Sequence, residues 1–120
     1  MSQFHVIGQL LGANFNSVAD QAIPLWPGKA AIVTHIIVTN ASLSLTLAAG
    51  GVYTGAGKTG TIVVPAAQVY SVLTGAGLAL VIPAAIAVRV LTGQVFLALT
   101  TGQGAAATAD VYVCGIAADQ

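Results

Sequence analysis

The stretch Ile32-Val-Thr-His-Ile-Ile-Val-Thr39 decides the fold class of this 120-residue chain. Every residue in it except His35 is β-branched, and β-branched side chains favour extended strands over helices. We therefore predict a strand from Lys29 to Thr39, which Asn40-Ala-Ser42 turns. Beyond that turn, leucine alternates with serine or threonine from Leu43 to Leu47, which predicts a second strand with one buried face.

The pattern of a short apolar strand followed by a glycine or proline turn continues outward in both directions. Turn signals recur about every 8 to 12 residues, which is typical of all-β sandwiches, jelly rolls and small barrels. Further extended segments are expected at Gln3–Leu11, Ala22–Pro27, Val52-Tyr53 after a bulge at Gly50-Gly51, Thr61–Val64, Ala66–Leu73, Leu78–Ile82, Ile86–Leu91, Gln94–Thr100 and Asp110–Ile116. Alanine leaves short helices open at Ala66–Tyr70 and Ala84–Ala87. We predict an all-β fold: one antiparallel β-sandwich domain over residues 1–120, of the jelly-roll kind.

The chain carries very little charge for a protein of its size. Charged residues make up 5% of it, and the whole segment Thr59–Val88 contains no Lys, Arg, Asp or Glu, whereas an ordinary soluble domain has about 25% charged residues. A compact monomer needs a solvated polar shell, but here Ser, Thr, Gly and Ala stand where Lys and Glu are usual. We therefore expect much of the outside to be covered by other subunits.

A membrane-spanning helix does not explain the uncharged segment, because Pro65 and Pro83 would break it and its apolar residues alternate with a period of two. The start Met1–His5 shows no basic region followed by an apolar one, so we expect no secretory signal. Nucleic acid is not expected as a partner either, since the formal net charge is zero and no basic stripe exists. The single cysteine, Cys114, excludes an internal disulfide and suits a reducing cytoplasm.

The sequence contains no catalytic, cofactor or metal motif that meets its spacing requirement. Gly51–Thr59 resembles a phosphate-binding loop, but Val52 stands where the first glycine is needed and a strand follows instead of a helix. His35 is expected on the same strand face as Val33 and Ile37, as a core or interface histidine. Cys114 is expected as a small buried residue on the Tyr112 face of the last strand. We predict no enzyme activity, cofactor or metal.

Trp26, in Pro24-Leu-Trp-Pro27, has two interpretations. Its ring could form a platform for a sugar or peptide, or it could close one end of the sandwich or anchor a subunit contact. The second role is the more common one for a large amphipathic side chain between prolines.

Four segments together resemble small β-rich virion proteins of tailed bacteriophages: Ile32–Asn40, the serine-leucine segment to Leu47, Ala48–Thr54 and Leu97–Val113. The related proteins are capsid decoration, cement or head auxiliary proteins. The resemblance implies a jelly roll or related sandwich, a homo-oligomer with a trimer favoured, binding to the major capsid protein, and a place in the virion after assembly in the host cytoplasm. A tail or fibre-attachment protein and a carbohydrate-binding module are the alternatives.

Chain ends and exposed loops are the elements that extend most easily onto neighbouring proteins. We therefore expect contacts from Ser2–His5, the Asn14–Pro27 loop and the tail Ile116–Gln120. The interface candidates within them are Ser2, Gln3, Phe4, His5, Phe15, Leu25, Trp26 and Ile116. The segment Ser2–Leu11 could add to the edge of a neighbour's sheet, so its deletion should spare the fold more than the binding.

Overall fold

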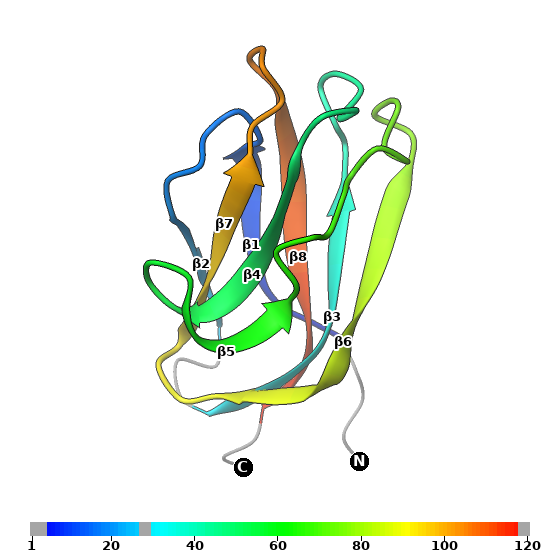
Figure 1. The fold of residues 1–120 in the computed structure, drawn as a ribbon. Coiled ribbons are helices and arrows are strands. Elements are labelled where there is room, and N and C mark those ends of the chain that lie inside the picture. Colours follow the sequence, from blue (N-terminus) through cyan, green and yellow to red (C-terminus); the bar gives the residue numbers. More distant parts are fainter. Residues whose placement is uncertain (1–4, 27–29, 118–120) are drawn as a thin grey trace.

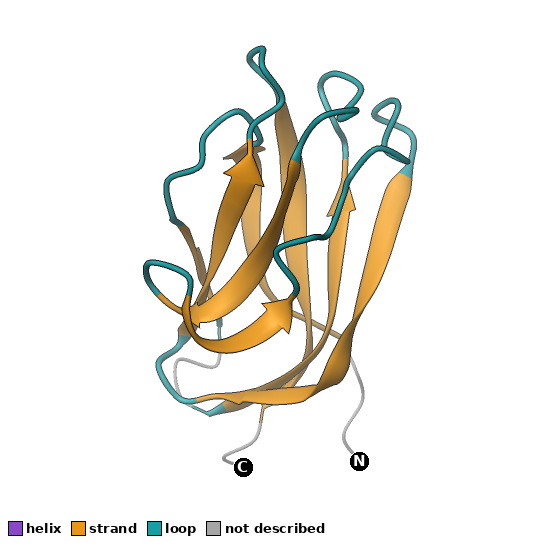
Figure 2. Cartoon of the chain, in the orientation of Figure 1, coloured by secondary structure: helices purple, strands orange, loops and turns teal. Residues whose placement is uncertain are grey.

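The computed structural model describes residues 5–26 and 30–117, and these form two antiparallel β-sheets with no helix among them (Figures 1 and 2). No described part of the chain therefore provides a helix long and apolar enough to cross a membrane. The strands are β1 (His5–Asn14), β2 (Gln21–Pro24), β3 (Ala31–Thr39), β4 (Ala49–Gly55), β5 (Thr59–Val64), β6 (Ala79–Val90), β7 (Gln94–Thr101) and β8 (Thr108–Ala117). The all-β prediction is confirmed.

The two four-stranded sheets are built by nested pairing. One sheet has the order β1-β8-β3-β6 and the other β2-β7-β4-β5, and they face each other as two layers (Figure 1). The first strand pairs with the eighth, the second with the seventh, the third with the sixth and the fourth with the fifth. Consecutive strands therefore often lie in different sheets, and the loops β1–β2, β3–β4, β5–β6 and β7–β8 gather at the upper end in Figure 1.

The core lies between the sheets and consists of aliphatic side chains from both of them. Val33, Ile36 and Val38 of β3 are fully buried, as are Val111 and Val113 of the neighbouring β8. No polar or charged residue is buried in the described part of the chain. The sandwich is thus held together by apolar burial, at about 25 cal/mol per Å² removed from water.

A bulge in β3 corrects the predicted position of His35. In its pairing with β8, β3 passes from Val33 opposite Gly115 to His35 opposite Cys114, so β3 carries one extra residue there. The pairing with β6 shifts at the same place, but there the extra residues are on β6, between Val88 and Pro83. Val33 therefore faces the core, while His35 and Ile37 lie on the outer side of the sheet and are half-buried. His35 shares a face with Ile37 as expected, but not with Val33.

The upper end of the sandwich is closed by a cluster of buried side chains. Phe15, Leu45, Tyr70 and Leu73 are each 0% exposed, although all four belong to loops. The rings of Phe15 and Tyr70 meet edge to face, with centroids 5.2 Å apart at an interplanar angle of 77°, a favoured aromatic geometry. The buried Tyr70 hydroxyl donates a hydrogen bond to the Gly50 carbonyl at 3.0 Å. We call these four residues the apical plug.

Two predicted strands are loops in the structure. Residues 40–48 form a loop in which only Leu45 of the three leucines is buried, while Leu43 and Leu47 are exposed. Asn40 adopts a positive φ of 57°, and the Ser42 hydroxyl accepts a hydrogen bond from the Thr108 N–H. The backbone conformation at Asn40 and this contact with a residue 66 positions away override the alternation of the sequence. Ala66–Leu73 is likewise neither strand nor helix.

Other predictions about the strands are corrected in detail. A register shift does occur between Ala49 and Gly50, but the extra residue is Thr100 on β7, so the expected bulge lies on the partner strand and not at Gly50-Gly51. Leu78–Ile82 and Ile86–Leu91, expected as two strands, instead belong to the single strand β6, which runs through Pro83. Proline in sheets is confined to edge strands and bulges, and Pro83 meets both conditions, because β6 is an edge strand and its pairing with β3 shifts between Val88 and Pro83.

The first strand is part of the sandwich. β1 pairs along β8 from His5 to Asn14, and its Ile7 side chain is 1% exposed. The described part of Ser2–Leu11 therefore has an intramolecular partner, which corrects the expectation that this segment is dispensable for the fold. Removing β1 would strip β8 of one neighbour and open the core.

Candidate functional site

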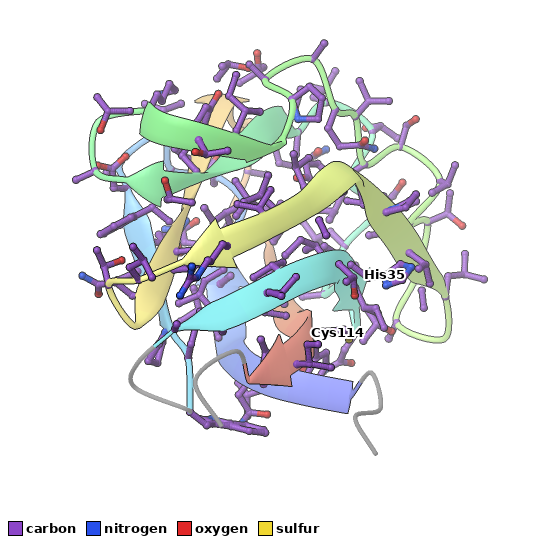
Figure 3. The ribbon with its side chains drawn as sticks, turned by 90° about the horizontal axis from the view of Figure 1, so that it is seen from below. His35 and Cys114 are labelled. Atoms are coloured by element: carbon purple, nitrogen blue, oxygen red, sulfur yellow. The ribbon has the colours of Figure 1, made fainter. Side chains whose placement is uncertain are left out.

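The described part of the chain brings two reactive side chains together, His35 and Cys114, which are opposite each other on β3 and β8 (Figure 3). The Thr34 hydroxyl donates to the Cys114 carbonyl at 3.3 Å, and Thr34 Oγ1 lies 3.0 Å from His35 Nδ1. Because that hydroxyl has one proton, Nδ1–H of the ring is the donor in the second contact. Partial burial raises the pKa of the Cys114 thiol, which lowers the fraction of reactive thiolate.

Among the described residues, no third His, Cys, Asp or Glu side chain joins this pair. Within residues 5–26 and 30–117 no three His, Cys, Asp or Glu side chains are close enough to hold a metal ion. The loop resembling a phosphate-binding motif is the β4–β5 hairpin, where Lys58 is exposed and Gly57 N–H donates to the Asp20 carboxylate at 2.6 Å.

The predicted interface residues fall into three groups. Ser2, Gln3 and Phe4 lie outside the described residues, and His5 begins β1 with its side chain outside the description. Phe15 and Leu25 are buried at 0% and 4% exposure, so they belong to the core and offer no surface to a partner. Trp26 is 58% exposed and Ile116 is half-buried on the outer side of β8. Only these last two are described surface residues.

A larger apolar surface lies on the loops at the upper end of the molecule. It consists of the exposed side chains of the β3–β4 and β5–β6 loops, namely Leu43, Leu47, Val69, Val72 and Leu78, each 45% to 62% exposed. We call it the apical surface. The loops 40–48, 65–78 and 102–107 contain no Lys, Arg, Asp, Glu or His. Large exposed apolar side chains without surrounding charge are typical of protein interaction sites.

Hydrogen bonds between loops hold the apical surface in one shape. The Gln103 side chain reaches from the β7–β8 loop, and its Oε1 accepts from the N–H groups of Leu47 at 2.9 Å and Ala48 at 3.1 Å. Its Nε2 donates to the Thr46 hydroxyl at 3.1 Å. The Leu45 N–H donates to the Leu73 carbonyl at 3.0 Å and so joins the other two loops.

The apical plug supports the same loops from below. In the β3–β4 loop the buried Leu45 separates the exposed Leu43 and Leu47. In the β5–β6 loop the buried Tyr70 and Leu73 alternate with the exposed Val69 and Val72. Leu43, Leu47, Val69 and Val72 are therefore each within two residues of an anchored side chain, which reduces the conformational entropy that these loops lose on binding.

The second apolar surface is the outer face of the sheet β1-β8-β3-β6, which we call the outer face. Its side chains alternate with core residues along each strand, and the apolar ones are Val6, Ile32, Ile37, Val81, Pro83, Ala87, Tyr112, Cys114 and Ile116. Antiparallel sheets with one side in water usually place polar residues there. This face instead combines many apolar side chains with a smaller polar set: Gln9, Thr34, His35, Thr39, Arg89 and Asp110.

Comparison with known proteins gives no relative. No protein-family model matches the chain, and no curated protein or solved structure matches it significantly. The two surfaces therefore have to be interpreted from their own chemistry.

Proposed function

We propose that the chain is a non-enzymatic structural protein of a virion, which attaches to the major capsid shell and stabilises it. The apical surface carries this proposal, because it is apolar, free of charge and held in one shape before any partner arrives. A preformed apolar surface suits docking onto another protein. It offers neither the acid and base pair of an enzyme nor a basic stripe for nucleic acid.

The fold that we propose is a jelly roll, and the nested pairing supports it. A jelly roll arises when a long antiparallel hairpin folds over, so that strands equidistant from its centre stay paired. The pairs β1–β8, β2–β7, β3–β6 and β4–β5 follow that rule. Jelly rolls occur in viral capsid and lectin domains, which agrees with a virion role without requiring it.

The proposed action is thermodynamic. A protein that binds the assembled shell, and not its separate subunits, stabilises the shell by mass action. Several copies contacting neighbouring capsid subunits gain avidity from simultaneous weak contacts. We propose that the chain acts as a homo-oligomer, is assembled in the host cytoplasm and remains in the virion, since oligomers multiply such contacts.

Co-sedimentation with capsid particles of the virus that encodes the chain tests the proposal. Leu47→Asp places a charge on the apical surface, where Leu47 is 62% exposed, so folding should be spared while particle occupancy falls at least tenfold. Leu91→Asp is the matched control, because Leu91 is 67% exposed on the β6–β7 loop. Equal occupancy of both variants would exclude the apical surface as the attachment site.

Trp26 favours a second candidate, a carbohydrate-binding module. Its ring is 58% exposed, and an accessible aromatic ring is a suitable platform for a sugar. A glycan array distinguishes the two functions: the module should bind a glycan, and Trp26→Ala should abolish the signal. If the protein shows no glycan signal, only the structural role remains. A tail or fibre-attachment location would be recognised by immunogold labelling of particles at the tail.

A further inference from the structure

We propose that the outer face of the sheet β1-β8-β3-β6 binds the same face of a second copy of this chain, around a two-fold axis at the centre of β3. The copies meet on this face with two-fold symmetry, and they do so in the purified protein without any capsid. This contact therefore stands or fails independently of attachment to a capsid.

The apolar character of both sides of this sheet is the first argument. On β3, the core side holds Val33, Ile36 and Val38, while the outer side holds Ile32 and Ile37 together with the half-buried Thr34, His35 and Thr39. The neighbouring β6 adds Val81, which is 54% exposed and lies opposite Ile37. On the other side of Ile37, β8 adds Tyr112. A row of adjacent apolar side chains thus crosses the middle of the face, as in a sheet buried on both sides.

The sheet edges are poorly suited to association, which leaves the faces. Edge strands often recruit other chains unless bulges, prolines or short length prevent it. β1 is interrupted by two register shifts, and β6 contains Pro83. In the other sheet, β2 has four residues and ends at Pro24, and the pairing of β5 with β4 shifts twice. Addition of a strand at an edge is therefore disfavoured on all four edges.

The charges of the outer face are complementary to those of a second copy. Among the described side chains of this face, the charged ones are Arg89 and Asp110. Arg89, on β6, lies opposite Ile32 at one end of β3, and Asp110, on β8, lies opposite Thr39 at the other end. Because β6 and β8 flank β3 on its two sides, the centre of β3 is midway between the two charges.

The two-fold axis lies in the plane of the contact, passes over that centre and runs at right angles to the line between the two charges. It therefore exchanges the two corners of the face. It places Arg89 of each copy beside Asp110 of the other, so that two ion pairs form symmetrically. Such an isologous contact uses one patch twice and closes as a dimer. The Asp110 carboxylate already accepts from Gly12 N–H at 2.9 Å and from Asn40 Nδ2 at 3.1 Å, which fixes its position at the corner.

The size of the face is sufficient for a specific contact. Four strands spaced about 4.8 Å apart, with a rise of about 3.3 Å over the 9 residues of β3, cover roughly 500 Å². Two such faces bury about 1,000 Å² in total, which is the lower limit for a specific interface. We therefore expect a reversible, concentration-dependent dimer.

Sedimentation equilibrium of the purified protein and a matched pair of variants test the inference. Val81→Glu puts a charge into the middle of the face and should weaken dimerisation at least a hundredfold. Ile62→Glu is the control, because Ile62 is also a β-branched strand residue and is 57% exposed, on β5 of the other sheet. The control should dimerise like the wild type, and circular dichroism should show that both variants fold.

A charge exchange tests the symmetry with residues at the corners. Arg89→Glu and Asp110→Arg should each weaken self-association roughly tenfold, because like charges then meet twice. An equimolar mixture of the two variants should form a heterodimer of near wild-type stability. At one of its corners the introduced carboxylate meets the introduced guanidinium, and at the other the native Arg89 meets the native Asp110. Only the proposed two-fold contact predicts this recovery.

The outcomes decide the inference in either direction. A wild-type monomer at all concentrations, a trimer, or equal loss in Val81→Glu and Ile62→Glu would overturn it. A mixture of the corner variants that stays monomeric would overturn the axis. If Leu47→Asp dimerises normally but fails to bind particles, the dimer contact on the outer face stands and attachment to the capsid uses the apical surface. If the wild type dimerises but binds no particles, only the virion role is refuted.

Discussion

Replacing Tyr70 with phenylalanine tests whether the apical plug determines the stability of the upper end. The substitution keeps the ring that meets Phe15 edge to face and removes only the hydroxyl that donates to the Gly50 carbonyl. A typical hydrogen bond contributes about 1 kcal/mol net, and a buried carbonyl left without its donor costs about 1–3 kcal/mol. We expect Tyr70→Phe to lower the free energy of unfolding by about 1.5–2 kcal/mol.

Urea unfolding at low protein concentration measures this difference, and the melting temperature should fall by about 5–10 °C for a domain of this size. Tyr112→Phe is the matched control, because Tyr112 is half-buried on the outer face. Its effect should stay within about 0.5 kcal/mol. If Tyr70→Phe lies within that same margin, the hydroxyl does not hold the loop and the reasoning about the plug is refuted.

The same residue sets the response of stability to alkaline pH. Burial, with a smaller contribution from Tyr53, raises the pKa of Tyr70 well above its ordinary value of 10.0. Above pH 10 the unfolded state therefore releases the phenolic proton while the native state keeps it, so stability falls as pH rises. The slope from this group is at most about 1.4 kcal/mol per pH unit, and Tyr70→Phe should remove it. An unchanged slope in the variant would show that Tyr70 ionises freely in the folded protein.

Three further predictions concern other parts of the fold. Gly50→Ala should lower the free energy of unfolding by more than about 2 kcal/mol, because the added Cβ would overlap the backbone of Leu99. Gly77→Ala is the control: its added Cβ meets open space, so the free energy of unfolding, measured by thermal unfolding, should change by less than about 1 kcal/mol. Gln103→Ala should lower the free energy of unfolding by about 2 kcal/mol and speed amide hydrogen exchange at Leu47, because it removes the acceptor of the Leu47 N–H. Unchanged exchange would contradict the role of Gln103 in holding the apical surface in one shape. Cys114 should react with iodoacetamide more slowly than a free thiol at about pH 8, because its pKa is raised, and equal rates would contradict that burial.

The strands were predictable where local sequence and long-range packing agree. β3 is β-branched almost throughout and lies in the interior of its sheet between β8 and β6, so propensity and environment favour the same state. The predicted strands Gln94–Thr100 and Asp110–Ile116 correspond to β7 and β8 within one or two residues at each end. The alternation survives in the burial pattern of β8, whereas in β7 Leu97, Ala98 and Leu99 are all buried.

The apical surface could not be recognised in advance, because its sequence imitates a strand. Alternation from Leu43 to Leu47 predicted one buried face, yet only Leu45 turns inward. The contacts that decide this come from Gln103 and Thr108, more than 50 residues away. Long-range contacts of this kind have no local signal. The bulge that turns His35 outward is a similar case, since β3 alone does not reveal it.

The choice of interface residues was limited for the same reason. Chain ends and loops were expected to be exposed, but Phe15 and Leu25 are drawn into the core by the closing of the sandwich. Ile116 lies on the outer face because alternation along β8 continues to its end. The low charge of the sequence predicted that much of the outside would be covered by other subunits. The positions of the apolar surfaces could be found only from the fold.

Quantitative mass spectrometry of purified virions, combined with cryo-electron microscopy of the same particles, tests the central claim most directly. The account predicts that the chain is present in a fixed ratio to the major capsid protein, with density on the outside of the shell whose contact includes Leu47 and Val72. It also predicts that particles lacking the chain rupture at lower temperature. Absence of the chain from purified particles, or particles whose stability does not depend on it, would contradict the account.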